Sequence, residues 1–365
     1  MISAKINALV DGAYNLNASD IHLVQDSPVY LRIDGRMRPV KDAHFSAEEL
    51  KAFLEKIIPA NLQPGLRQRG GADFGWQPDD RMRFRVAAYL ERERLRIVMR
   101  LIKIKILTLE ELELPEVFHT VASWYRGLVL LTGVTGSGKS TTLAALINHI
   151  NQRESRCIIT IEDPIEMVHP NLRSVVSQRE VGRDVEGFRH GLVQALRQDP
   201  DVILIGEMRD PETISTSLRA AETGHFVFST MHTTNALHTL ERIFSEFPEN
   251  EHALLREQLA NNLRATITQR LVRRAAGKGR CAALEIMVVN DMIRKLLLDN
   301  EIASIGTVIR ERRDGMVLFD QHLADLVRGG IVKEEDAVEA VEDPFIFRRY
   351  LRGTTAGADR GGIIG

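Results

Sequence analysis

Cysteine is scarce in this sequence. Among 365 residues only Cys157 and Cys281 occur, far apart and each within an apolar run. Neither belongs to a CxxC pair, so the sequence does not predict a zinc site built on cysteines. Isolated cysteines in apolar surroundings are typical of buried structural thiols, and we expect this role for both.

Long apolar runs and a strong charge imbalance are also missing. No apolar segment approaches the ~18 residues needed to cross a bilayer. The opening MISAKINALVDGAYN lacks the basic region and small-residue cleavage site of a signal peptide. The net charge is −2 and aromatic residues are only 5%, whereas nucleic-acid binders are usually strongly basic. We expect a soluble cytoplasmic protein without a nucleic-acid partner, able to dock peripherally on a membrane complex.

The composition otherwise suits a globular protein of two or three domains, with 44% hydrophobic and 27% charged residues. Residues 1–105 predict a small α/β domain with strands at 21–24, 29–33, 82–89 and 95–102. The stretch 46–58 has helical spacing, and Ser46 with Glu49 three residues later indicates a capping box at its start.

A charged linker, residues 106–116, precedes a different pattern. Short apolar runs alternate with helical stretches at 128–131, 158–161, 202–205 and 226–228. This alternation predicts a parallel sheet buried on both faces. We expect residues 117–352 to form this second domain, helical towards its end. The Gly-rich tail 353–365 has little to bury and predicts disorder.

The strongest motif is a G-x-x-x-x-G-K-S loop between an apolar strand and a helix-compatible segment. Its glycines allow the backbone to turn tightly and aim N–H groups at phosphate oxygens. Lys139 is expected to reach the β and γ phosphates, and the Ser140 hydroxyl to ligate Mg²⁺. The pattern predicts an ATP and Mg²⁺ site, with these contributing residues: Gly133, Thr135, Gly136, Ser137, Gly138, Lys139, Ser140 and Thr141.

Hydrolysis further requires a carboxylate that orients water and another that supports the metal. Glu162, Glu166 and Glu207 follow apolar strands, and ligands of parallel sheets lie at such carboxyl ends. Gly206 stands where a generic Walker B strand carries Asp. The sequence pattern alone does not identify which of the three glutamates is the general base.

Two further groups have both a functional and an ordinary interpretation. His232 and the two threonines after it end a strand, where they could sense the γ-phosphate or contact a neighbouring subunit. Arg81, Arg83 and Arg85 alternate with apolar residues, so they project from one strand face and could neutralise developing phosphate charge. An ordinary hydrogen-bonded histidine and a solvated strand face are the alternatives. Asp210 is expected to cap a helix that begins at Pro211 and ends near Gly224.

The motifs together resemble the secretion ATPase superfamily, and within it most closely the type IV pilus retraction ATPases (PilT family). Walker A, Asp box, Walker B and His box correspond to GVTGSGKSTTLAALI, TIEDPIEMVH, ALRQDPDVILIGEMRDPETI and AAETGHFVFSTMHTTNA, with SQREVG between. Outside the core, ASDIHL, LRIDGR, MRFRV and GMVLFDQ are similar to further family motifs. The resemblance covers residues 10–330 and implies a PAS-like N-terminal domain followed by a RecA-like ATPase domain.

The resemblance also implies roles. Glu166 would be the general base, and Glu207 the Walker B acid, holding Mg²⁺ through water. His232 and His225 would be His-box contacts. The arginines Arg83, Arg85 and Arg100 would reach the nucleotide of an adjacent subunit in a homohexamer. The implied partner is the platform protein of the pilus machine, at the cytoplasmic face of the inner membrane, and the implied activity is ATP-driven retraction.

Other interpretations stay open. Residues 291–297, DMIRKLL, match the retraction motif AIRNLI only in part, so an accessory retraction paralogue (PilU) is one alternative. The longer N-terminal region and four-cysteine insertion of assembly ATPases are missing, which argues against assembly. The main support for a nucleic-acid motor is the basic run 270–280, whose side chains could contact phosphates. We expect this run instead to be a helix end followed by a Gly turn. A regulator that binds ATP without hydrolysing it is a third class.

Overall fold

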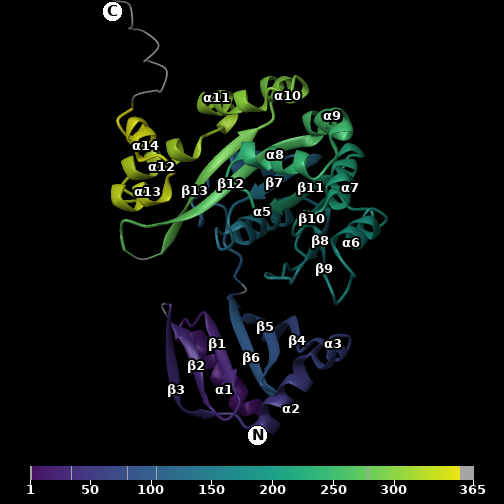
Figure 1. Cartoon of the computed structure of the whole chain (residues 1–365), viewed down its shortest axis with the longest axis vertical. Coiled ribbons are helices and arrows are strands. Elements are labelled where there is room, and N and C mark those ends of the chain that lie inside the picture. Colours follow the sequence, from purple (N-terminus) through teal and green to yellow (C-terminus); the bar gives the residue numbers. More distant parts are fainter. Residues whose placement is uncertain (1, 34, 80, 104, 278, 354–365) are drawn as a thin grey trace, which may run out of the picture. The chain divides into compact units, whose positions relative to one another are not determined.

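The computed structural model describes residues 2–33, 35–79, 81–103, 105–277 and 279–353 (Figure 1). Contacts divide the chain into two compact units. The first comprises residues 1–106, 161–170 and 178–187, and the second comprises 107–160, 171–177 and 188–365. All of the tail predicted to be disordered except Gly353 lies outside the described residues.

The first unit contains a six-stranded sheet in the order β3-β2-β1-β6-β5-β4, with every described pairing antiparallel. The strands and helices are α1 (Ile2–Asn15), β1 (Asp20–Val24), β2 (Pro28–Ile33), β3 (Arg36–His44), α2 (Ala47–Ile57), α3 (Gln63–Arg69), β4 (Gly71–Asp79), β5 (Met82–Glu91) and β6 (Arg94–Lys103). The four predicted strands and the predicted helix are therefore present.

Strand alternation and capping explain these elements. On β5, Met82, Phe84 and Val86 are fully buried and face the core. At the start of α2, the Ser46 hydroxyl accepts a hydrogen bond from the Glu49 N–H, and the Glu49 carboxylate accepts one from the Ser46 N–H. The capping box predicted from the sequence is thus confirmed.

A second sheet of seven strands, in the order β13-β12-β7-β11-β10-β8-β9, lies in the second unit except for the last residues of β8 and β9, which belong to the first unit. Its strands are β7 (Gly127–Thr132), β8 (Cys157–Glu162), β9 (Val175–Glu180), β10 (Val202–Ile205), β11 (Phe226–Met231), β12 (Leu263–Arg273) and β13 (Arg280–Val288). Its helices are α4 (Val117–Ala122), α5 (Lys139–Arg153), α6 (Phe188–Ala195), α7 (Pro211–Glu222), α8 (Ala236–Ser245), α9 (His252–Asn262), α10 (Asp291–Leu298), α11 (Ile305–Arg310), α12 (Phe319–Arg328), α13 (Glu334–Ala340) and α14 (Pro344–Leu351).

The centre of this sheet is parallel, as predicted. Strand β7 pairs in parallel with β11 and β12, and β11 pairs in parallel with β10. All residues of β7, β10 and β11 are buried because helices pack on the sheet. The four apolar runs recognised in the sequence correspond to β7, β8, β10 and β11.

The basic run at 270–280 is not a helix end, so that expectation is wrong. Residues 263–273 form β12, and they pair antiparallel with β13 over the registers Ala265 with Val288 to Arg273 with Arg280. Only the glycine turn was predicted correctly: Gly277 and Gly279 both have positive φ. Arg270 donates to the Ala340 carbonyl, and Arg274 forms an ion pair with Glu113, so both arginines have structural partners.

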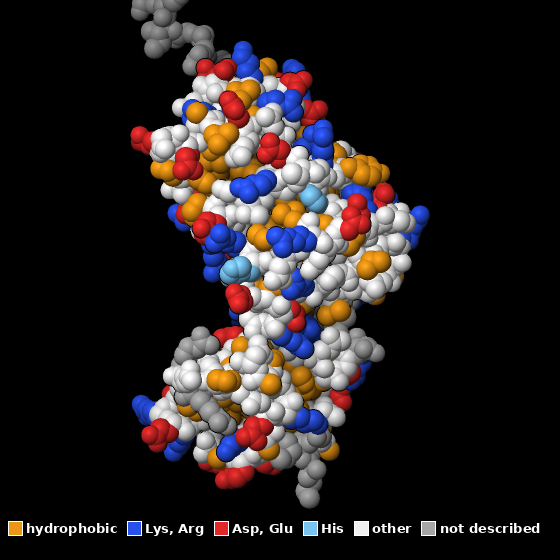
Figure 2. All heavy atoms as spheres, turned by 90° about the vertical axis from the view of Figure 1, so that its right-hand side faces the viewer, with side chains coloured by type: hydrophobic (Ala, Val, Ile, Leu, Met, Phe, Trp, Pro, Cys, Tyr) orange, Lys and Arg blue, Asp and Glu red, His pale blue; other side chains and the backbone are white. Residues whose placement is uncertain are grey.

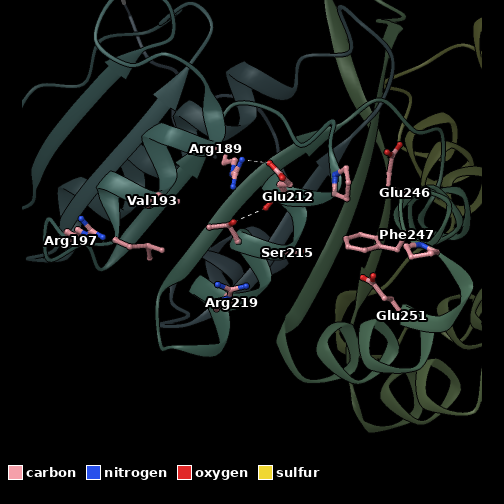
Figure 3. Close-up of a pocket in the computed structure, with 13 residues that line it drawn as sticks. Arg189, Val193, Arg197, Glu212, Ser215, Arg219, Glu246, Phe247 and Glu251 are labelled. Atoms are coloured by element: carbon pink, nitrogen blue, oxygen red, sulfur yellow. Dashed lines mark hydrogen bonds and ion pairs between the residues drawn. The ribbon is translucent and has the colours of Figure 1, made fainter.

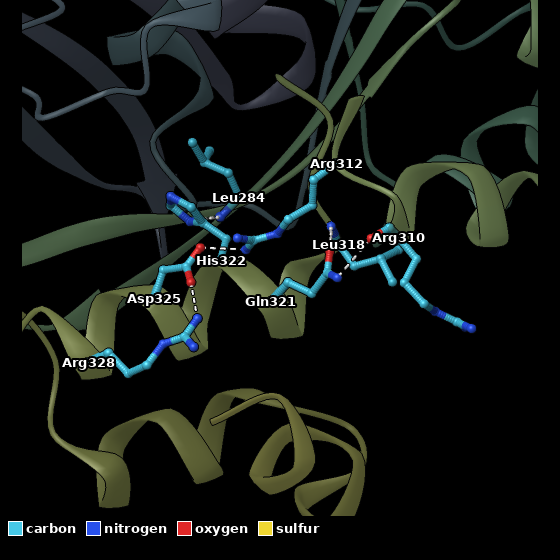
Figure 4. Close-up of polar contacts among 8 residues, drawn as sticks. All are labelled: Leu284, Arg310, Arg312, Leu318, Gln321, His322, Asp325 and Arg328. Carbon is cyan, nitrogen blue, oxygen red and sulfur yellow. Dashed lines mark hydrogen bonds and ion pairs between the residues drawn. The ribbon is translucent and has the colours of Figure 1, made fainter. Parts of the chain in front are cut away.

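The C-terminal helices are organised around the segment 315–321. Val317 exchanges backbone hydrogen bonds with Ile286 of β13. The Gln321 side chain accepts from the Leu318 N–H and donates to the Arg310 carbonyl, while His322 Nδ1 accepts from the Leu284 N–H (Figure 4). Asp325 pairs with Arg312 and Arg328 in the same view. This sequence motif therefore joins the helices to the sheet.

The surface combines both signs of charge. Figure 2 shows lysine, arginine, aspartate and glutamate side chains interspersed on the face that it presents. Among the described helices, none is both long and apolar enough to span a membrane.

Candidate nucleotide-binding site

The phosphate-binding motif forms the turn between β7 and α5. Gly133, Gly136 and Gly138 all have positive φ, at 139°, 80° and 92°. A Cβ on Gly133 would lie 2.4 Å from the Gln269 carbonyl oxygen, and one on Gly138 would lie 2.6 Å from Gln269 Nε2. Both positions therefore require glycine for two reasons, backbone conformation and space. Helix α5 begins at Lys139, so its N-terminus faces the loop.

Lys139 is buried and folds back on the loop. Its Nζ donates to the carbonyl oxygens of Gly133 and Val134, at 2.6 and 3.2 Å. A phosphate oxygen is a stronger acceptor than a carbonyl, so a bound nucleotide can draw the ammonium group from these partners. Ser140 and Thr135 are exposed, and Thr141 is partly exposed, which leaves their hydroxyls accessible to a ligand.

Gln269 of β12 supports the loop, and sequence reasoning missed it. Its Nε2 donates to the Ser137 carbonyl at 2.8 Å, and its Oε1 accepts from the Thr142 hydroxyl at 2.8 Å. One buried amide therefore holds both sides of the turn. No local motif could reveal it, because Gln269 lies 132 residues from Ser137 in the chain.

The loop also has an unused polar atom. The Ser137 hydroxyl is buried without a hydrogen-bond partner among the described residues. Buried polar groups are normally satisfied, so such an atom in a phosphate-binding turn fits a site built for a ligand. Together with the lysine and the helix N-terminus, the residues fit a nucleotide phosphate and its Mg²⁺.

Glu207 and His232 meet at the carboxyl ends of neighbouring strands. Glu207 follows β10 and His232 follows β11, and these strands are adjacent. His232 Nε2 lies 3.2 Å from Glu207 Oε1, and Arg209 lies 2.6 Å from the other oxygen. Glu207 is 15% exposed, whereas His232 is 43% exposed. The mostly buried carboxylate is thus held by two basic side chains on the same edge of the sheet as the phosphate loop.

The segment after His232 has an evident structural role. Thr233 shares a hydrogen bond with Thr239, Thr234 with His238, and Asn235 caps α8. The buried Glu285 of β13 accepts from the Ala236 N–H at 2.7 Å. Burial raises the pKa of Glu285, although this hydrogen bond opposes the rise. Most of the predicted His-Thr-Thr cluster therefore fixes a helix N-terminus.

Glu162 and Glu166 flank a turn stabilised by Gln178. The Gln178 amide donates to Glu162 Oε1 at 3.0 Å and to the Met167 carbonyl at 2.8 Å. Glu162 ends β8, and Glu166 lies four residues later and is partly exposed. Both glutamates belong to the first unit, and the phosphate loop belongs to the second.

The three arginines differ in their surroundings. Arg83 is buried, covers Gly75 and forms an ion pair with Glu180 at 3.0 Å, within the first unit. Arg100 is exposed and donates to Asp20 at 3.0 Å. Burial would raise the pKa of Asp20, but hydrogen bonds from Ser19 and Arg100 lower it below its usual value. Arg85 is exposed. The alternative interpretation of Arg81, Arg83 and Arg85 as a solvated strand face does not hold for Arg83, which is buried, whereas Arg81 and Arg85 are exposed.

His225 does not join the phosphate loop within the second unit. It precedes β11, so it lies at the opposite edge of the parallel sheet from His232. Its Nδ1 is 2.9 Å from the Ala220 carbonyl and 3.2 Å from the Thr223 hydroxyl, at the end of α7. The Asp210 side chain accepts from the Thr213 N–H at the other end of α7, so the predicted cap is confirmed.

A separate pocket of about 640 Å³ lies among α6, α7 and the segment after α8 (Figure 3). Arg189 pairs with Glu212 there, and Phe247 forms part of the wall. None of the predicted nucleotide-site residues lines this pocket.

A parallel sheet, a glycine-rich phosphate loop at its carboxyl edge and acidic strand ends define a P-loop ATPase. Residues 1–339 match the family described as Type II/IV secretion system protein, and the chain belongs to this family.

Named relatives refine this assignment. The chain is 43% identical over 308 residues to a twitching motility protein of Neisseria gonorrhoeae, covering 84% of this chain and 82% of that protein. It is 42% identical over 328 residues to the type IV pilus retraction ATPase PilT of Pseudomonas aeruginosa, covering 90% and 95%. A crystal structure of the pilus retraction motor PilT with bound ADP superposes with a TM-score of 0.87 at 39% identity, covering 93% of this chain and 98% of that one. The resemblance recognised from the motifs is confirmed.

Proposed function

We propose that this protein is an ATPase motor that drives the retraction of type IV pili, and hence twitching motility. The observation that carries the proposal is the complete phosphate loop on its strand and helix, in a chain similar over most of its length to a retraction ATPase. The reaction is the hydrolysis of ATP to ADP and phosphate, with Mg²⁺ supplying charge neutralisation when it is bound with the nucleotide.

Each residue has a proposed role in this reaction. The N–H groups of the phosphate loop and Lys139 would bind the phosphates, and the Ser140 hydroxyl would be a ligand of Mg²⁺. Glu166 accepts a proton from the attacking water as the general base. Glu207, which His232 contacts at 3.2 Å, would support Mg²⁺ through water when the metal is bound. Glu162 remains the alternative base.

The subunit arrangement is also part of the proposal. We infer a homohexameric ring in which the PAS-like first domain, residues 1–105, serves the nucleotide of a neighbouring subunit through Arg85 and Arg100. The RecA-like domain, residues 117–352, carries the nucleotide. The motor would dock peripherally on the platform protein at the cytoplasmic face of the inner membrane.

Two alternatives make different predictions. The chain is also 36% identical to the type IV pilus ATPase PilU of Pseudomonas aeruginosa, so an accessory role in retraction is the second candidate. The nucleic-acid motor loses its main support, because the basic run forms the β12–β13 hairpin with Arg270 and Arg274 engaged within the fold.

Gene deletion in the native host, with complementation, tests the function. We expect the deletion strain to carry more surface pili and to lose twitching, with rescue by the wild type but not by Lys139→Ala. An accessory paralogue would lose only part of the twitching, and fewer pili would indicate an assembly motor. Hydrolysis itself is tested by measuring phosphate release from ATP with the purified protein. We expect the rate to fall by about 10² or more in Glu166→Gln relative to the wild type.

A further inference from the structure

Two histidines and a glutamate converge away from the nucleotide site. Glu110 lies in the segment 107–116, His119 on α4 and His149 on α5. One potential ligand atom from each side chain lies within 4.8 Å of the others. His119 Nε2 is 3.6 Å from Glu110 Oε1, and the two imidazole rings pack edge to face with centroids 4.8 Å apart. None of the three belongs to the phosphate loop or to an acidic strand end.

The backbone around the cluster is fixed by packing. On α4 the neighbours Phe118 and Val121 are fully buried, and on α5 Ile150 is fully buried. Leu109, directly before Glu110, is also fully buried in the same core. The side chains of Thr108 and Glu111 each accept a hydrogen bond from the other's N–H, which holds the turn that carries Glu110. The three side chains are therefore brought together by ordered elements.

Hydrogen bonding does not explain this convergence. The 3.6 Å separation of His119 and Glu110 is too long for a hydrogen bond. Within the described part of the chain, the structure records no hydrogen bond to either imidazole ring. Two partly buried histidines thus place ring nitrogens within 4.8 Å of each other and of a carboxylate oxygen, and the contact recorded for these nitrogens among the described residues is the ion pair of His119 with Glu110.

We propose that Glu110, His119 and His149 bind a Zn²⁺ ion. Two imidazole nitrogens and one carboxylate oxygen form a common zinc ligand set, and the fourth position is left for water. Ligand atoms around tetrahedral zinc lie about 3.3 Å apart, so the side chains need to move by only about 1 Å from their present positions. Mg²⁺ prefers oxygen ligands, so the metal used with ATP does not compete for this site.

The site would connect three parts of the second unit. Glu110 comes four residues after Ile106, where the first unit's N-terminal stretch ends. A zinc ion held jointly with α4 and α5 would fix the chain where it enters the ATPase unit. Arg153 lies one helical turn after His149 and adds positive charge, so the Glu110 carboxylate is needed to balance the metal.

Zinc stoichiometry on the full-length chain tests the proposal. The protein would be saturated with Mg²⁺ and ADP, dialysed against ZnCl₂ and analysed for metal by mass spectrometry. We expect about one Zn²⁺ per chain, a rise in Tm on zinc addition and visible absorption bands when Co²⁺ replaces Zn²⁺. His119→Gln and His149→Gln should abolish all three signals, and Glu110→Gln should weaken zinc binding at least about tenfold.

Matched variants keep the test independent of folding and of ATP turnover. His44→Gln changes an exposed histidine on β3 and should retain zinc. Because Glu110 is exposed, Glu110→Gln should fold normally, which circular dichroism checks. The proposal fails if the wild type binds no zinc. It also fails if His119→Gln and His149→Gln fold, as judged by circular dichroism, and still retain the same zinc content as His44→Gln.

Discussion

Gln269 is a residue whose importance only the folded chain reveals. Replacing it with Ala would leave the Ser137 carbonyl and the Thr142 hydroxyl without their buried partner. We expect Gln269→Ala to destabilise the protein by about 1–3 kcal/mol and to weaken ATP binding by loosening the loop. Calorimetric titration with a non-hydrolysable ATP analogue measures the effect. Gln194→Ala, on the exposed side of α6, is the control and should bind normally.

His322 predicts a pH dependence of stability. Burial lowers its pKa to about 4 from an ordinary value of 6.5. Between pH 6.5 and 4 the unfolded chain therefore binds a proton that the native state does not, so stability falls as the pH falls, by about 1.4 kcal/mol per pH unit. His169, whose pKa burial also lowers to about 4, acts in the same direction. Burial raises the pKa of Asp320 to about 6. Between pH 6 and 3.8 this carboxyl therefore binds a proton in the native state that the unfolded chain does not, so its contribution to stability rises as the pH falls.

Thermal unfolding at pH 7 and pH 5 checks this dependence. Between pH 7 and pH 5, the loss of stability caused by the two histidines exceeds the gain caused by the single aspartate. The wild type should therefore melt at a lower temperature at pH 5. His322→Gln can keep an acceptor for the Leu284 N–H but has no proton to take up, and it should show a smaller difference between the two pH values. An equal difference in wild type and variant would assign the pH effect to other groups.

At the scale of elements, α2 offers a test of local stability. Ser46→Ala removes one half of a capping box, at a cost of about 1 kcal/mol. We expect amide hydrogen exchange in α2 to accelerate by about fivefold, as measured by mass spectrometry. Ser304 precedes α11 without forming a side-chain cap bond, so Ser304→Ala should leave exchange in α11 unchanged.

How far the sequence predicted each element depended on what its residues bury. Strand β7 was recognisable because all its residues are buried and five of its six are apolar or glycine. Strand β12 was not, because it buries Thr266, Thr268 and Gln269 and carries arginines at its end. Its apolar signal is interrupted by polar side chains that only tertiary partners satisfy. For the same reason the role of Gln269 could not be predicted from the sequence. The phosphate loop could be predicted because its residues are consecutive.

At the scale of the whole molecule, the proposed ring predicts complementation between inactive variants. A subunit with Arg85→Ala keeps an intact phosphate loop, and a subunit with Lys139→Ala keeps an intact Arg85. In a random 1:1 mixture about a quarter of the ring's interfaces would pair the two intact halves, so phosphate release should partly return. Mixing without recovery would argue that Arg85 does not act across subunits. Arg83 is a poorer probe, since its buried pair with Glu180 makes Arg83→Ala damaging to folding as well.

The hydrogen bond from Gln269 to Ser137 also bears on how the protein is made. During synthesis the phosphate loop leaves the ribosome long before β12, since 132 residues separate the two partners. Strand β12 lies beside β7 in the finished sheet, so the nascent loop has neither its amide support nor one neighbour of its strand. Such distant pairings form slowly. The phosphate loop of the nascent chain therefore gains its amide support only after residue 269 has been translated, and we expect tight ATP binding to begin late in synthesis.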